Sequence, residues 1–290
     1  MSRPPFLALP GCASAYRLRT ARGEFAVHDA RPEGGDVRGT VLLVPGFTGS
    51  KEDFIALLAP LADAGFRAVA VDGRGQYETP GPRDEAAYDQ QELALDVLAQ
   101  AEAVGGGVHL LGHSLGGLIA RAAVLKDVAP FRSLTVMSSG PGAISASQQA
   151  RTRRLLQALP VLDMESIWRE MQREGAANPP EDTDVAAAAP GVTEFLHRRW
   201  LGTVPEQLLV TGRQLTEEPD RTAELARVPL AKHVISGELD YAWPVPHIDA
   251  MAEELGAVRT VVPGAGHSPN AEQPAATARA LLAFWTSTSA

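Results

Sequence analysis

The stretch Val108-His109-Leu110-Leu111-Gly112-His113-Ser114-Leu115-Gly116-Gly117 decides how the rest of the chain is interpreted. It begins as a short apolar run, breaks at Gly112 and is followed at once by helix-forming sequence from Leu118 to Lys126. This order predicts a buried strand that turns sharply into a helix, with Ser114 at the apex of the turn. The glycines at 112 and 116 lack the Cβ atoms that would collide across so tight a turn.

Two interpretations of Ser114 follow from this arrangement. Its hydroxyl would project from the carboxyl end of the strand, where open parallel sheets collect their ligands, and could act as a nucleophile. Alternatively, the serine only caps the helix that follows it. The strand-like run before Ser114 and the helix-like run after it favour the nucleophile.

Strands and helices alternate through the first half of the chain. Strands are predicted over residues 23–29, 40–44, 67–71 and 134–137 in addition to the run at 108–111. One helix is expected to start at the capping sequence 50–53, and another is expected over about 85–104. The alternation predicts an α/β fold with a doubly wound, mostly parallel sheet.

The pattern changes between Pro141 and about Arg227, where only helices are predicted. Apolar residues at helical spacing mark Asp163–Glu174 and Thr193–Leu201, with a loop over 176–190 between them. Strands return at 233–236 and 258–262, before a last helix over about 271–285. We therefore expect a core domain made of residues 1–140 and 228–290, with a helical insertion over 141–227.

Composition excludes several classes of protein. The chain has 290 residues, of which 45% are hydrophobic, and a formal net charge of -9, which argues against binding to nucleic acid. Cys12 is the only cysteine, so no intrachain disulfide can form and a reducing, cytoplasmic location is expected. No stretch reaches the roughly 18 uninterrupted apolar residues that a membrane span requires.

A nucleophilic serine needs a base within hydrogen-bond reach, and the base needs an orienting acid. Asp240 follows the strand over 233–236, and His267 follows the strand over 258–262. The chain order Ser, Asp, His is the one associated with a serine on a sharp strand-to-helix turn. Glu238 is the nearest competitor of Asp240 for the role of the acid.

With these residues the chain resembles the α/β-hydrolase superfamily, in particular serine esterases with a helical cap before the strand that carries the acid. The motifs that carry the resemblance lie at 112–116, 237–240, 266–267 and 72–75, and the similarity covers about Gly23 to Trp285. The resemblance implies a Ser114–His267–Asp240 triad that acts on esters, thioesters or related acyl compounds.

The resemblance also implies an oxyanion hole made by two backbone amides, those of Phe47 and Leu115. The family usually has His-Gly at the head of the first loop, whereas this chain has Pro45-Gly46. The Phe47 amide can still donate a hydrogen bond when proline replaces histidine at the head of the loop. The imidazole that often holds this loop in place is, however, missing.

Other residues receive weaker assignments. Trp168, Met171, Trp200 and Trp243 are candidate pocket walls, with packing in a core as the alternative. His113 is expected to point away from the serine and to pack. No His, Cys or Asp cluster has metal-ligand spacing, so no metal is expected, and no glycine-rich dinucleotide motif is present, so no cofactor is expected.

The expected function is hydrolysis of a carboxylic ester on a small acyl substrate, through an acyl-enzyme intermediate. Branches with an acid nucleophile, which act on haloalkanes and epoxides, are disfavoured by Ser114. The alternatives are a peroxidase-like, lyase or cofactor-free oxygenase activity on the same frame, or a binding protein that keeps a triad but barely turns over. Acyl chain, leaving group and oligomeric state are not specified by the sequence.

Overall fold

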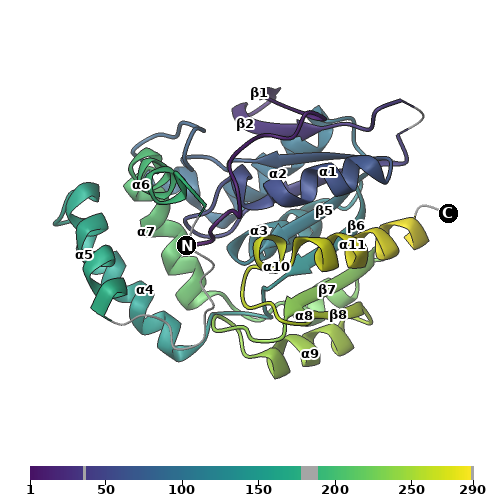
Figure 1. Cartoon of the computed structure of the whole chain (residues 1–290). Coiled ribbons are helices and arrows are strands. Elements are labelled where there is room, and N and C mark those ends of the chain that lie inside the picture. Colours follow the sequence, from purple (N-terminus) through teal and green to yellow (C-terminus); the bar gives the residue numbers. More distant parts are fainter. Residues whose placement is uncertain (35–36, 178–188, 289–290) are drawn as a thin grey trace.

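One mostly parallel sheet of eight strands forms the centre of the computed structural model, which describes residues 1–34, 37–177 and 189–288 (Figure 1). The strand order is β1-β2-β4-β3-β5-β6-β7-β8, in which β2 pairs antiparallel with both β1 and β4 and the remaining pairings are parallel. The predicted sheet type is confirmed. The strands are β1 Ala13–Thr20, β2 Gly23–Ala30, β3 Gly39–Val44, β4 Phe66–Val71, β5 Val108–His113, β6 Phe131–Met137, β7 Ala231–Gly237 and β8 Val258–Val262.

Helices cover both faces of this sheet. On one face, α1 (Ile55–Asp63) and α11 (Pro274–Thr288) share a core with the inward side chains of the strands. On the other face lie α2 (Gln90–Ala103), α3 (Leu115–Lys126) and α9 (Val245–Glu254). Burial on both faces explains why the central strands read as continuous apolar runs.

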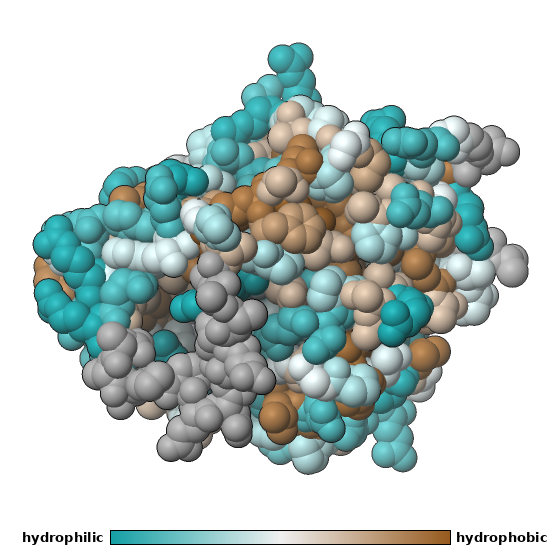
Figure 2. All heavy atoms as spheres, in the orientation of Figure 1, coloured by the Kyte–Doolittle hydropathy of each residue, from teal (hydrophilic) through white to brown (hydrophobic). Residues whose placement is uncertain are grey.

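Between β6 and β7 the described residues form only helices, as predicted for 141–227; we call this stretch the helical segment. Its members are α4 (Ala146–Ala158), α5 (Met164–Ala177), α6 (Val192–Gly202), α7 (Pro205–Glu217) and the short α8 (Thr222–Ala226). Four of them, α4 to α7, lie to one side of the sheet, at the left of Figure 1, and share an apolar core of their own. Their outer surface is mostly hydrophilic (Figure 2).

Several elements differ from the sequence-based expectation. The chain begins with the edge strand β1, in which only Leu18 is buried, so it carries no clear alternating pattern. The helix expected over 85–104 is two elements, η2 (Glu85–Tyr88) and α2, because Asp89 has an extended backbone, with φ -53° and ψ 142°.

The C-terminal helix also differs, because it is divided into α10 (Pro269–Glu272) and α11. Proline lacks the amide proton needed inside a helix but is accepted in the first turn, and Pro274 starts α11. Most of the loop expected over 176–190 lies outside the described residues.

The carboxyl ends of the parallel strands share one edge of the sheet. The loops after β3, β5, β6, β7 and β8 all leave from this edge, and the helical segment connects two of these strands, β6 and β7. Ligands of open parallel sheets bind at this edge. It is therefore the place to look for a functional site.

Candidate active site

Ser114 occupies the turn between β5 and α3 with φ 55° and ψ -121°. This conformation is rare for a residue with a side chain and costs on the order of 1–3 kcal/mol. A Cβ atom at Gly112 would overlap the backbone of Gly116, and one at Gly116 would overlap the backbone carbonyl of Val44. The sharp turn therefore requires both glycines.

The folded chain brings together the three side chains that the sequence proposes as a triad. Nε2 of His267 lies 3.0 Å from Oγ of Ser114, and Nδ1 of His267 lies 3.0 Å from each carboxylate oxygen of Asp240. Since a carboxylate can only accept, Nδ1 carries the proton, which leaves Nε2 as an acceptor for the serine hydroxyl. This arrangement can activate a serine.

Asp240 is fixed by its own surroundings. Its side chain is completely buried, and one of its oxygens accepts hydrogen bonds from the backbone amides of Ala242 and Trp243, at 2.8 and 3.1 Å. Burial opposes ionisation, but the hydrogen bond from His267 and those from the two amides outweigh it, so the pKa of Asp240 is lowered. The competing acid, Glu238, instead accepts from the Gly264 amide at 3.1 Å.

His113 does more than pack, in contrast to the sequence-based expectation. Its side chain lines the same cavity as Ser114, and its Nε2 lies 2.8 Å from the backbone carbonyl oxygen of His267. Burial, together with the repulsion that its charged form would feel from a charged His267, lowers the pKa of His113 to about 3. The neutral ring therefore donates to this carbonyl and holds the His267 loop in place.

Phe47 and Leu115, whose backbone amides the sequence proposes as oxyanion donors, both lie close to Ser114 in the chain or in space. Leu115 follows the serine directly, and a Cβ atom on Gly46 would lie only 3.0 Å from Cβ of Ser114. Among the described residues, neither amide has a hydrogen-bond acceptor. Both are thus available to an oxygen atom bound beside Ser114.

Gln76 braces the Phe47 loop from the loop that follows β4. Its Nε2 donates to the Gly46 carbonyl at 3.0 Å, and its Oε1 accepts from the Gly73 amide at 3.0 Å. Its side chain is buried. Gln76 therefore takes the place of the imidazole brace that Pro45 lacks, and sequence motifs alone gave no signal for it.

We expect Gln76→Glu to lower kcat about tenfold or more, with a small change in KM, because a carboxylate cannot donate to Gly46 and the Phe47 amide would shift. The effect should stay below that of deleting an oxyanion donor outright, which costs about 100- to 1,000-fold. The measurement is steady-state kinetics on a chromogenic ester. Gln214→Glu is the matched control, because Gln214 of α7 also donates its amide to a backbone carbonyl, that of Tyr88 at 2.8 Å, and has no hydrogen bond to the Phe47 loop. Equal losses in both variants would contradict the brace.

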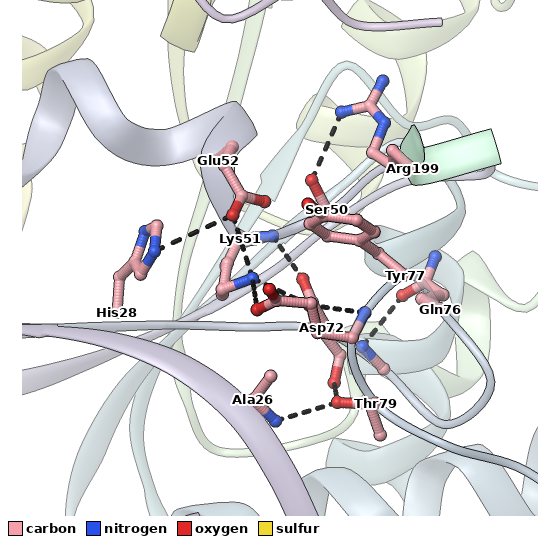
Figure 3. A network of polar contacts seen from close by, with 12 residues as sticks. Ala26, His28, Ser50, Lys51, Glu52, Asp72, Gln76, Tyr77, Thr79 and Arg199 are labelled. Carbon is pink, nitrogen blue, oxygen red and sulfur yellow. Dashed lines mark hydrogen bonds and ion pairs between the residues drawn. The ribbon is translucent and has the colours of Figure 1, made fainter. Parts of the chain in front are cut away.

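A buried ionic network lies behind this loop (Figure 3). Nζ of Lys51 contacts Asp72, Glu52 and Glu78 at 3.0, 2.9 and 2.7 Å, and the Lys51 amide donates to Asp72 at 2.7 Å. Burial opposes the charge on Lys51, but the carboxylates outweigh it and the pKa of Lys51 is raised. The network fixes the start of η1 (Lys51–Phe54), which follows the Phe47 loop directly.

The helical segment is tied to the same region by a second buried pair. Arg199 of α6 contacts Asp53 at 2.7 Å, and both side chains are completely buried. The guanidinium also donates to Oγ of Ser50 at 3.3 Å (Figure 3) and to the Ser2 carbonyl at 2.8 Å. The position of α6 is therefore coupled to the loop beside Ser114.

A cavity of about 360 Å³ opens beside Ser114. Its floor contains Ser114, His267 and the Phe47 loop, and its walls come largely from α4 and α5. Tyr241, the residue after Asp240, also lines it and packs its ring 4.8 Å from the His267 ring. The cavity can hold a small substrate against the serine.

Of the four candidate pocket walls, only Met171 lines this cavity. The assignment is wrong for the three tryptophans. Trp168 and Trp200 belong to the apolar core of the helical segment, where the Trp200 indole donates to the Met164 carbonyl at 2.7 Å. Trp243 is buried in the core of the sheet and donates to the Gly142 carbonyl at 2.9 Å. Large apolar surfaces with satisfied N–H groups are stable in cores, which explains their positions.

Within residues 1–34, 37–177 and 189–288, no three His, Cys, Asp or Glu side chains gather so that they could hold a metal ion. Over the same ranges, no helix combines the length and the apolar character needed to cross a membrane.

Comparison with known proteins gives a family and several relatives. The profile of the "Alpha/beta hydrolase family" matches residues 41–280. A putative carbamate hydrolase RutD from Variovorax paradoxus is 37% identical over 109 residues, which covers 37% of this chain and 41% of the relative. The acetyltransferase component of an acetoin cleaving system from Cupriavidus necator is 30% identical over 276 residues, covering 90% of this chain and 66% of the relative.

Among solved structures, a thermophilic esterase from Thermogutta terrifontis superposes with a TM-score of 0.73 at 24% identity, covering 96% of this chain and 100% of that one. This likeness concerns the fold. The chain spans less than two thirds of the length of the two curated relatives above.

Proposed function

The chain belongs to the alpha/beta hydrolase family, and on that premise we propose that it is a serine hydrolase that cleaves a carboxylic ester or a related acyl bond. One observation carries the proposal: Ser114, His267 and Asp240 form a continuous hydrogen-bonded chain at 3.0 Å per step, with the serine on a strained turn facing a cavity. The strain and the chain of contacts are both expected of an activated nucleophile.

In the proposed reaction, Nε2 of His267 takes the Ser114 proton while Oγ attacks the acyl carbon. The amides of Phe47 and Leu115 stabilise the oxyanion of the tetrahedral intermediate. His267 then protonates the leaving group, which departs and leaves an acyl-serine. A water molecule, deprotonated by His267, attacks this acyl group, the bond to Oγ breaks, and His267 returns the proton to Oγ as the acid leaves, with Asp240 holding the imidazole in place throughout.

We further propose that residues 141–227 act as a cap over a core made of residues 1–140 and 228–290. The position of α4 and α5 beside the cavity supports this division. A cap of this kind would exclude water around a forming oxyanion and would select substrates by shape and charge. A cytoplasmic location remains a prediction from the single cysteine, Cys12.

A fluorophosphonate probe and a panel of p-nitrophenyl esters and carbamates test this function. We expect one probe molecule per chain, attached to Ser114 and located by peptide mass spectrometry, together with ester turnover that the probe abolishes. Labelling without turnover would favour the binding protein or a non-hydrolytic activity. Absence of labelling, with the probe active on a control serine esterase, would contradict the nucleophile.

A further inference from the structure

Two arginines of α4, Arg151 and Arg154, line the cavity that contains Ser114. Neither has an ion-pair or hydrogen-bond partner elsewhere in the described part of the chain. This sets them apart, because most other arginines of the helical segment are paired with carboxylates. The paired arginines are Arg169, Arg173, Arg198, Arg199, Arg213 and Arg221.

The acidic residues that share the cavity do not neutralise these arginines. Glu170 is paired with Arg173 at 2.6 Å, and Asp53 is paired with Arg199 at 2.7 Å. Glu174 also lines the cavity, but its single negative charge is smaller than the two positive charges of the arginines. The charge that is left unmatched in the cavity is therefore positive.

The start of α4 is fixed next to the proposed triad. The Ser145 amide donates to the Ala242 carbonyl at 2.7 Å, and Oγ of Ser145 donates to the Tyr241 carbonyl at 3.0 Å. With a rise of about 1.5 Å per residue, Arg151 lies roughly 9 Å along the helix from Ser145, and Arg154 about one turn further. The positions of the two arginines on α4 thus lie about one short acyl chain along the helix from its end beside the proposed triad.

We propose that the substrate carries a carboxylate at the end remote from the scissile carbonyl, and that Arg151 and Arg154 bind it. This rests on the proposed ester hydrolysis and narrows its substrate to half-esters and related acyl compounds of dicarboxylic acids. Residues three apart share a helix face, and the planar guanidinium matches the two oxygens of a carboxylate. A singly charged carboxylate fits better than a phosphate dianion, because Glu174 lines the same cavity and would repel a second negative charge.

The test compares two p-nitrophenyl esters of equal chain length, the adipate half-ester and the neutral hexanoate. We expect Arg151→Gln combined with Arg154→Gln to lower the ratio of kcat/KM for adipate over hexanoate by about 10- to 100-fold, the usual effect of a lost charge-assisted hydrogen bond. Because both side chains are exposed to solvent, added NaCl should lower the same ratio in the unaltered protein.

Arg153→Gln is the matched control. Arg153 lies on the same helix, donates to Gln149 at 2.8 Å and does not line the cavity, so its loss should leave the ratio unchanged. An unaltered ratio in the double variant, with hexanoate still hydrolysed, would overturn this inference while the proposed function stands.

If neither ester is hydrolysed, the result contradicts the proposed function. The carboxylate site is then tested by a measurement of ligand binding that does not depend on hydrolysis. Isothermal titration calorimetry of the Ser114→Ala variant with monomethyl adipate should then show binding. This binding should disappear when Arg151→Gln and Arg154→Gln are introduced into the same variant. Equal binding with and without the arginines, or no binding at all, would overturn the carboxylate site.

Discussion

Ser114→Ala is expected to lower kcat for ester hydrolysis by about 10⁶-fold while the melting temperature changes little. The substitution removes one hydroxyl that faces a cavity, so no buried packing is lost. Without Oγ no acyl-serine can form, and only the weak effects of binding and the oxyanion donors remain. Steady-state kinetics and thermal melting of the two proteins measure both quantities.

His267→Ala should lose about as much activity, and the double variant little more, since the members of a triad act as a unit. Ser139→Ala is the matched control, because Ser139 is a buried serine just after the neighbouring strand β6 and does not line the cavity. Its hydroxyl has no hydrogen-bond partner among the described residues, so activity should be retained. Substantial ester turnover by Ser114→Ala would rule out the nucleophile.

Asp240→Asn is expected to lower kcat by about 10⁴-fold. An amide in this position can donate to Nδ1 of His267, which favours the tautomer with the proton on Nε2 and removes the acceptor for the Ser114 hydroxyl. Backbone contacts from Ala242 and Trp243 can still reach the amide oxygen, so the fold should persist. Kinetics on the same ester, with circular dichroism as a check on folding, provide the measurement.

Glu238→Gln provides the comparison for this variant. Glu238 precedes Asp240 by two residues, and its carboxylate accepts only the Gly264 amide among the described contacts, a contact that glutamine can reproduce. The kcat of the Glu238→Gln variant should remain close to that of the unaltered protein. If the two variants ranked in the opposite order, Glu238 would have to be the acid.

Most of the sheet could be predicted from the sequence because its central strands are buried on both faces and therefore appear as short apolar runs. The edge strand β1 and the helix α4 could not. In β1 only Leu18 is buried, and α4 has no buried residue, so neither element carries the periodicity on which such predictions depend.

The residues proposed to react differ in the same way from the residues that form the cavity walls. Ser114, Asp240 and His267 each follow a strand in a short motif, and parallel strands bring such loops together. The residues that form the walls of the cavity are not marked by any comparable sequence motif. From the sequence, Arg151 is indistinguishable from an ordinary surface residue of a helix, yet it lines the cavity. Trp200 is expected in a core from its apolar side chain and helical spacing, and it does lie in the core of the helical segment.

The buried pair of Arg199 and Asp53 bears on how substrate reaches the serine. Lifting α6 away from the core would carry Arg199 with it and leave the buried Asp53 without its ion-pair partner, which costs roughly 3–5 kcal/mol. At that cost fewer than about one molecule in a hundred would have α6 raised at any moment. α4 is held at its start by the hydrogen bonds of Ser145, but within the described structure it has no fully buried residue and no buried ion pair, so an outward movement of its far end would cost less. We therefore expect substrates and products to pass beside this end of α4, near the two arginines proposed to bind the carboxylate.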